Sequence, residues 1–223
     1  MVHISGRVQR ARVTLPEGVL PVRQERGGRT RDRLLKAGQR LIAKRDFDSM
    51  SVADIATAAS CSVGAFYQRF RDKDGFFGAL VAQYVSEARA TTVALFEKFH
   101  DDRLIGALVL ATATRFRNYR GLIRAAIRKQ LEEPTVWDPI RRQGYFAADS
   151  FIAWQAARLG RNLTPSEIVA TRFAFQVLYG TLNNAIINKP GPLDLADDEF
   201  VVQLERAFRL ALLYSGNPPG IEL

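Results

Sequence analysis

Helical periodicity along nearly the whole chain constrains the fold more than any other feature of the sequence. In the first periodic stretch, Leu34, Leu41 and Ile42 are spaced so that they share one face of an α-helix. No stretch alternates apolar and polar residues as a half-buried strand would. Beyond two short helices described below, further helices are predicted at residues 76–98, 103–119, 122–132, 136–159, 165–188 and 197–214. The fold class is therefore predicted to be all-α.

Two short helices are predicted between the first helix and residue 76, joined by a tight turn. Ser51, with Asp54 three residues later, forms a near capping box that predicts the start of one helix, and Ser62 can cap the next. In that second helix, Phe66 and Phe70 lie four residues apart and are expected to point into a core. Two short helices with this connection predict a helix-turn-helix.

The segment from Val63 to Ala65 is made of small residues, at the start of the second short helix. A helix that enters the major groove of DNA needs small side chains where it meets the base edges. Cys61 lies in the turn and is interpreted as a small buried residue rather than a redox group. The sequence thus predicts that the helix beginning near Ser62 reads DNA.

The positive charge of the chain is concentrated at its N-terminal end. The formal net charge is +9, and residues 1–75 hold 15 Lys and Arg against 8 Asp and Glu. Such a one-ended excess is typical of proteins that bind nucleic acid or an anionic membrane surface, although a solvated basic tail would give the same pattern. Residues 1–27 show no sustained period and two prolines, so we expect a flexible basic arm rather than an amphipathic membrane helix.

Few of the residues and motifs that usually serve catalysis or metal binding are present. The chain has one Cys and two His, and it has no HExxH, GxSxG or phosphate-binding glycine motif. We therefore expect a protein that is not an enzyme and that holds no metal or cofactor. No apolar run is long enough to cross a bilayer and no secretory signal precedes the first helix, so a cytoplasmic location is expected.

The stretch SVADIATAASCSVGAFYQRFRDKDGFF, within residues 29–80, resembles the DNA-binding signature of the TetR (tetracycline repressor) family of transcriptional regulators. It departs from that signature where Ser60-Cys61 replaces the usual Gly-Val of the turn and Gly75 replaces a helix former. The elements that carry the resemblance are Ser51, Ile55-Ala56, the turn from Ala59 to Cys61, Ser62, Gly64, Phe66-Tyr67, Phe70 and Lys73-Asp74.

The resemblance implies an N-terminal three-helix helix-turn-helix head at 28–75 and a larger helical domain at 76–223 for effector binding and dimerisation. Tyr67 and Lys73 would contact phosphates, and Val63, Ala65 and Gln68 would meet bases. For the hydroxyl of Ser51 and that of Ser62, helix capping and DNA contact both remain open, and the start of the first helix can equally be solvated. The predicted DNA-binding residues are Arg29, Thr30, Ser51, Ser62, Val63, Gly64, Ala65, Tyr67, Gln68, Arg69 and Lys73.

The C-terminal region is predicted to form a homodimer and an effector pocket. The helix at 165–188 is apolar on more than one face, so a second copy of the chain is expected to cover it together with the helix at 197–214. A row of arginines from Arg117 to Arg128 can attract an anionic effector or simply be solvated. The candidate pocket residues are the aromatic side chains Phe116, Trp137, Phe146, Phe151, Trp154, Phe175 and Tyr179.

These features together predict a sequence-specific DNA-binding transcriptional regulator. The expected partners are a near-palindromic double-stranded operator, a second copy of the chain and a small-molecule effector that releases a repressor from DNA. The alternative is an architectural or constitutive DNA-binding dimer without an effector, which would bind in a salt-dependent way without operator preference.

Overall fold

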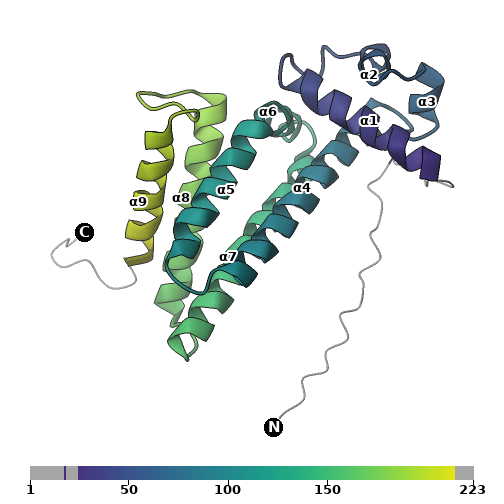
Figure 1. Cartoon of the computed structure of the whole chain (residues 1–223). Coiled ribbons are helices and arrows are strands. Elements are labelled where there is room, and N and C mark those ends of the chain that lie inside the picture. The colour runs from purple at the N-terminus through teal and green to yellow at the C-terminus, as the bar shows by residue number, and fades with distance from the viewer. Residues whose placement is uncertain (1–17, 19–24, 214–223) are drawn as a thin grey trace, which may run out of the picture.

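The computed structural model describes Gly18 and residues 25–213, with side chains from residue 28 onward. The predicted arm, residues 1–27, lies outside this part except for Gly18 and the first turn of the first helix. Within the described residues every regular element is a helix, as the periodicity predicted (Figure 1). The elements are α1 (Glu25–Ile42), α2 (Val52–Ala58), α3 (Val63–Tyr67), α4 (Lys73–Lys98), α5 (Arg103–Asn118), α6 (Arg120–Lys129), the short 3-10 helix η1 (Pro134–Trp137), α7 (Asp138–Leu159), α8 (Pro165–Ile187) and α9 (Asp198–Leu213).

The first three helices form a small unit, here called the head, at one end of α4 (Figure 1). Its centre is a cluster of fully buried phenylalanines from α3, from α4 and from the segment between them. The Phe66 ring centroid lies 5.2 Å from that of Phe70 and 5.4 Å from that of Phe76, and Phe70 and Phe76 meet edge to face at 5.0 Å. Because aromatic rings bury large apolar areas, this cluster ties the short helix α3 to the long helix α4.

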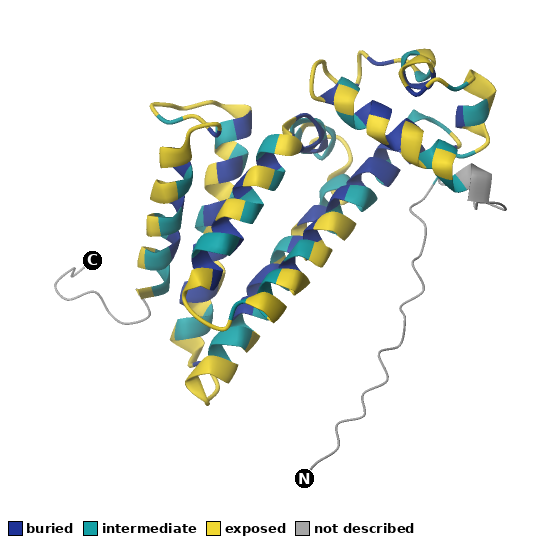
Figure 2. Ribbon diagram, in the orientation of Figure 1, coloured by how far each residue is buried: buried dark blue, intermediate teal, exposed yellow. Residues whose placement is uncertain are grey.

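Helices α4 to α9 form the larger part, here called the body. In Figure 1 the long helices α4 and α7 run beside each other, and α8 and α9 lie on the other side of α5. A second aromatic cluster joins α7, α8 and α9, where the buried Phe208 ring meets Phe151 at 5.8 Å and Phe175 at 5.2 Å. Figure 2 shows buried positions on the inward faces of these helices and exposed positions outside.

Side-chain hydrogen bonds cap the starts of α2, α3, α4 and α8. The Asp72 carboxylate accepts from the Gly75 backbone N–H at 2.7 Å, which starts α4, and Thr164 and Glu167 form a full capping box at α8. Helix α7 ends at Gly160, whose φ of 65° suits glycine. The largest boundary differences are at α1, which begins at Glu25 rather than near Arg29, and at α6, which ends at Lys129 rather than at 132.

Helix α6 packs directly against the head. Gly121 at its start lies so close to the end of α1 that a Cβ there would sit 1.9 Å from the Ile42 carbonyl oxygen. An ion pair from Arg128 to Asp46 at 3.0 Å continues the contact, and Lys129 pairs with Asp74 in the first turn of α4 at 2.9 Å. The head is therefore attached to the body through α6 as well as through α4.

None of the helices in the described part of the chain combines the length and the apolar character that a membrane crossing requires.

Candidate DNA-binding and effector sites

Helix α3 exposes its leading edge. The Ser62 hydroxyl accepts from the Ala65 backbone N–H at 3.1 Å and so starts the helix, while Phe66 is 0% exposed beneath it. Val63 is 42% exposed and Tyr67 50% exposed. A Cβ at Gly64 would meet only the Ser62 hydroxyl, at 3.8 Å. The outer side of α3 is thus an exposed ridge of small side chains, flanked by a tyrosine.

Helix α2 begins with a complete capping box. The Ser51 hydroxyl donates to the Asp54 carboxylate at 2.8 Å and accepts from the Asp54 backbone N–H at 3.0 Å. The Ser51 backbone N–H, which donates to this carboxylate at 2.8 Å, lowers the pKa of Asp54, and Arg45 adds an ion pair at 3.0 Å. Ser51 is exposed, and its capping hydrogen bonds fix the position of its side chain at the N-terminus of α2.

The turn between α2 and α3 contains a non-glycine residue in the left-handed region. The Ser60 N–H donates to the Thr57 carbonyl at 3.0 Å and the Cys61 N–H donates to the Ala56 carbonyl at 2.9 Å. This pattern of helix termination requires a positive φ at the intervening residue, and Ser60 adopts φ 51°. The sequence departs here from the expected glycine, yet the backbone takes the conformation that glycine would favour.

Ser60→Gly is expected to raise the free energy of unfolding by roughly 0.5–1 kcal/mol. Relief of the left-handed strain, about 1–2 kcal/mol, exceeds the extra backbone entropy that glycine brings to the unfolded chain, about 0.5–1 kcal/mol. Urea denaturation followed by circular dichroism measures the change, and Ser60→Ala, which keeps the strain, serves as the control. A Ser60→Gly protein less stable than the parent would show that the serine side chain contributes more than its backbone conformation costs.

The remaining predicted DNA-binding side chains lie in α1, just after α3 and at the start of α4. Lys73 donates to the Asp48 carbonyl at 2.9 Å and lies over the Phe47 ring at 4.8 Å, so its ammonium is held where α4 meets the loop before α2. Arg69 donates to the Ala65 carbonyl at 2.7 Å. Gln68 and Arg29 are exposed, whereas Thr30 is half-buried in α1.

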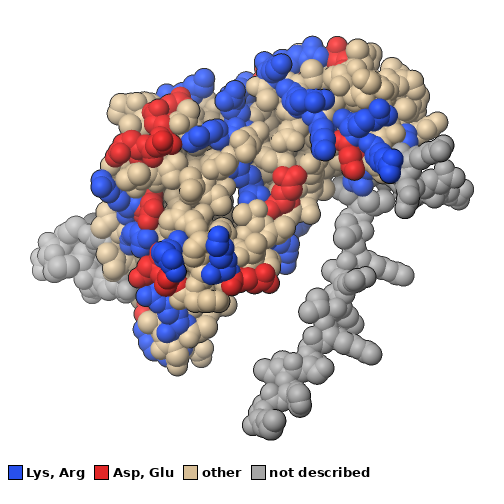
Figure 3. Space-filling model, in the orientation of Figure 1, with Lys and Arg blue, Asp and Glu red and all other residues tan. Residues whose placement is uncertain are grey.

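The head also carries its own cationic surface. Exposed Arg33, Lys36 and Arg40 follow one another along α1 at helical spacing. Figure 3 shows Lys and Arg side chains gathered over the head, with few acidic side chains between them on the face in view. Anionic phosphates would be attracted to this surface.

A cavity of about 670 Å³ opens in the body between α4, α5, α7 and α8. Of the predicted pocket aromatics, Phe116, Trp137, Phe175 and Tyr179 line it. Three others do not. The Phe146 ring is covered by the Arg89 guanidinium at 3.7 Å, Phe151 is fully buried in the second aromatic cluster, and the Trp154 indole donates to the Phe99 carbonyl at 3.1 Å.

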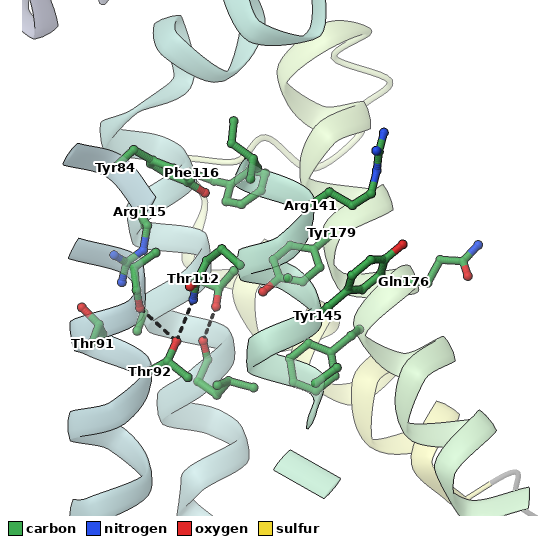
Figure 4. Close-up of a pocket in the computed structure, with 18 of the residues that line it drawn as sticks. Tyr84, Thr91, Thr92, Thr112, Arg115, Phe116, Arg141, Tyr145, Gln176 and Tyr179 are labelled. Atoms are coloured by element: carbon green, nitrogen blue, oxygen red, sulfur yellow. Dashed lines mark hydrogen bonds between the residues drawn. The ribbon is translucent and has the colours of Figure 1, made fainter. Parts of the chain in front are cut away.

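Polar side chains also line much of this cavity, most of them outside the predicted set of aromatic residues. Figure 4 shows the hydroxyl groups of Tyr84 and Tyr179 pointing toward the middle of the space. Burial raises the pKa of both tyrosines, that of Tyr179 to about 12, and the nearby positive charge of Arg115 only partly offsets this effect. The other polar lining residues are Thr91, Thr92, Thr112, Arg115, Arg141, Gln143, Tyr145, Asp149, Arg172, Gln176 and Asn183.

The signal that could have found these residues is a polar side chain on the inward face of a helix. In α5, Thr112 and Arg115 share a face with the buried Leu108 and therefore point inward. By contrast, the arginine row that begins at Arg117 does not line the cavity. Arg117 donates to the Leu195 carbonyl at 3.2 Å instead.

Across Gly18 and residues 25–213, no three His, Cys, Asp or Glu side chains come together in a way that could hold a metal ion.

Comparison with known proteins supports the architecture and the head. Residues 34–80 match the family model described as "Bacterial regulatory proteins, tetR family". No curated protein sequence matches the chain.

Solved structures extend the likeness beyond the head. A putative TetR-family transcriptional regulator from Mesorhizobium loti is 19% identical, with a TM-score of 0.67 over 85% of this chain and 98% of that one. A tetR-family regulator from Streptomyces coelicolor is 16% identical, with a TM-score of 0.63 over 83% of each chain. GusR from Salmonella enterica is 20% identical, with a TM-score of 0.60 over 82% of this chain and 95% of that one. At these identities the structures share a fold with this chain.

The family that matches residues 34–80 is one of bacterial regulatory proteins, in agreement with the function class expected from the sequence. Residues 34–80 therefore match the N-terminal region of the TetR regulatory family, and the chain as a whole shares the fold of these solved TetR-family structures.

Proposed function

We propose that the protein is a repressor that binds a near-palindromic operator as a homodimer and is released from it by a small molecule. The observation that carries the proposal is the exposed ridge of α3, held over a core of buried rings in the same chain as a cavity. An architectural DNA binder would need the basic head but no cavity of ligand size, since pockets for small molecules typically span about 300–1,000 Å³.

DNA would be contacted by the ridge and its surroundings. Val63 and Ala65 offer apolar contact to thymine methyl groups, and the exposed Gln68 can hydrogen-bond adenine. Tyr67 flanks the ridge, and together with Lys73 at the start of α4 it would bind phosphates, which fixes α3 in the groove. Ser51 and Ser62, at the exposed N-termini of α2 and α3, would approach the phosphate backbone while they cap these helices.

Removing the two side-chain groups proposed to bind phosphates should weaken DNA binding without changing the fold. The Tyr67→Phe, Lys73→Ala double variant is expected to bind operator DNA about tenfold less tightly, with a shallower dependence on salt, because one charge and one hydroxyl contact are lost. Fluorescence anisotropy at several salt concentrations measures both effects. Lys98→Ala, which removes the same charge at the far end of α4, is the control. Unchanged affinity of the double variant at moderate salt would show that these residues do not bind phosphates.

The dimer is proposed to form through α8 and α9. Phe173 is 54% exposed, and Val169, Val202 and Leu210 are also exposed on these two helices. Large apolar side chains on adjacent helices are typical of an interface, and a two-fold copy would complete a four-helix contact. Two heads on such a dimer would read two half-sites about one duplex turn, or a multiple of it, apart.

Phe173→Glu is expected to convert the dimer into a monomer at micromolar concentration, because a carboxylate would have to be buried at the centre of the interface. Light scattering coupled to size-exclusion chromatography measures the mass. Val93→Glu, at an exposed position of α4, should leave the mass unchanged. A dimer that persists in Phe173→Glu would place the interface elsewhere.

Ligand binding in the cavity is proposed to release DNA through α5 and α6, which connect the cavity to the head. Arg115 and Phe116 line the cavity in the last turn of α5, and α6 begins at Arg120 and packs against the head at Gly121. Tyr119 between them donates to the Glu87 carboxylate of α4 at 2.5 Å. A ligand that moves the end of α5 would shift α6 and therefore the spacing of the two heads.

Selection of bound sequences from a random DNA pool tests this function. An inverted repeat with a defined spacing is the expected result. Recovery of no motif, together with salt-dependent binding to every sequence, would instead support the architectural alternative.

A further inference from the structure

The cavity contains a guanidinium without a partner in the described chain. Arg115 lines the space, and its guanidinium makes no hydrogen bond or ion pair with residues 28–213. The other lining arginines are already neutralised, Arg141 by Asp138 at 2.5 Å and Arg172 by Asp149 at 3.6 Å. Asp149 is the one carboxylate among the described lining residues, so the cavity as a whole is positive.

Two tyrosine phenol groups line the same cavity as Arg115. Tyr84 and Tyr179 line the same cavity, and neither hydroxyl bonds to a described residue. A phenol is protonated at neutral pH, and burial raises the pKa of both tyrosines further, so each offers an O–H donor. A guanidinium with two phenol donors is suited to a carboxylate, which accepts through both of its oxygens.

A buried acceptor lies in the same cavity. Gln143 of α7 is only 7% exposed, and its Oε1 has no hydrogen-bond partner. The orientation of this amide follows from Thr92, whose hydroxyl donates to the Ala88 carbonyl at 2.9 Å and so accepts from Gln143 Nε2 at 3.4 Å. Asn183 of α8 likewise has a buried Oδ1 without a partner. Buried polar atoms without partners are costly, so these two carbonyl oxygens fit a ligand that brings a hydrogen-bond donor.

The remaining lining is apolar and aromatic. Phe116 and Tyr179 are stacked with ring centroids 6.1 Å apart, and Phe175 lies 6.1 Å from Tyr179. Leu95, Leu108 and Ile140 complete the apolar part of the wall. An aromatic body would pack against these rings.

We propose that the cavity binds an aromatic carboxylate that also carries a hydroxyl group, with the carboxylate on Arg115 and the hydroxyl donating to Gln143. This proposal adds a ligand class to the proposed function. It rests on that function only where it takes the bound molecule to be the effector. The tyrosine hydroxyls complete the carboxylate site, and the Asn183 carbonyl is a second acceptor for the hydroxyl.

Calorimetric titration of the full-length protein without DNA tests the proposal with three matched probes: 4-(4-hydroxyphenyl)butanoate, its alcohol 4-(4-hydroxyphenyl)butan-1-ol, and 4-phenylbutanoate. The hydroxylated carboxylate is expected to bind about tenfold more tightly than the alcohol. Arg115→Gln should abolish that preference. Arg120→Gln, which removes the same charge from an exposed position outside the cavity, should retain it.

Gln143→Leu should likewise remove the advantage of 4-(4-hydroxyphenyl)butanoate over 4-phenylbutanoate, whereas Gln143→Glu keeps an acceptor and should retain it. Equal affinity for carboxylate and alcohol would overturn the proposal. So would a preference that survives Arg115→Gln, or no binding of the carboxylates at about 1 mM by protein that is folded.

Operator release is measured separately, by adding the same probes to the protein–DNA complex. Carboxylate binding that leaves the complex intact would contradict the proposed release and leave the ligand class standing. Release by the alcohol but not by the carboxylate would overturn the ligand class and leave the regulator standing.

Discussion

Phe66→Ala is expected to lower the free energy of unfolding by about 3–5 kcal/mol, because it empties the centre of the head. The Phe66 ring is completely buried and contacts Tyr67, Phe70 and Phe76 with centroid distances of 5.2–5.5 Å. Helix α3 has five residues and cannot hold its shape without tertiary contacts. We therefore also expect Phe66→Ala to abolish specific DNA binding.

Urea denaturation followed by circular dichroism measures the stability of this variant. Leu110→Ala, at an exposed position of α5, should change it by less than about 0.5 kcal/mol. A loss below about 1 kcal/mol in Phe66→Ala would mean that the phenylalanine cluster does not support the head as described.

Gly121→Ala is expected to cost about 1–3 kcal/mol of stability and to weaken operator binding, because the added methyl group has nowhere to go. It would meet the Ile42 carbonyl oxygen at 1.9 Å, the Ile42 carbonyl carbon at 2.6 Å and the Ala43 nitrogen at 3.1 Å. All three are backbone atoms, which cannot rotate away as a side chain can. The head must therefore shift relative to α6.

Thermal and urea denaturation measure the stability loss, and anisotropy measures the change in binding. Gly28→Ala in α1 is the matched control, because a Cβ there meets nothing within 4 Å and alanine favours the helix by up to about 1 kcal/mol. If Gly121→Ala matched Gly28→Ala in both measurements, the close contact between α6 and the head would not matter for either property.

Helix ends were predictable from the sequence where a local hydrogen bond decides them. Ser62 and Asp72 cap α3 and α4 as expected, and the Asp54 carboxylate completes the box at Ser51. The start of α1 was placed too late because Gly27-Gly28 weakens the helical signal, although the helix continues through both residues. Helix α6 stops early because the chain turns before Pro134.

The cavity was less accessible to sequence reasoning. Side-chain size does not reveal which face of a helix borders empty space, so Phe151 and Trp154 were included although they pack in the body core. Arg115 was not singled out, since its exposure depends on how α4, α5 and α8 converge. The close approach at Gly121 likewise follows from tertiary packing, and a glycine at a helix start has no distinct signature of that contact.

The most direct test of the central claim places a charge on the leading edge of α3. Parallel selections from one random DNA pool are made with the parent chain and with Val63→Glu, after circular dichroism confirms equal helicity. The parent is expected to yield an inverted repeat and Val63→Glu no motif, because its carboxylate would face the bases and phosphates of the groove. Recovery of the same motif by both proteins would show that this edge of α3 does not read DNA.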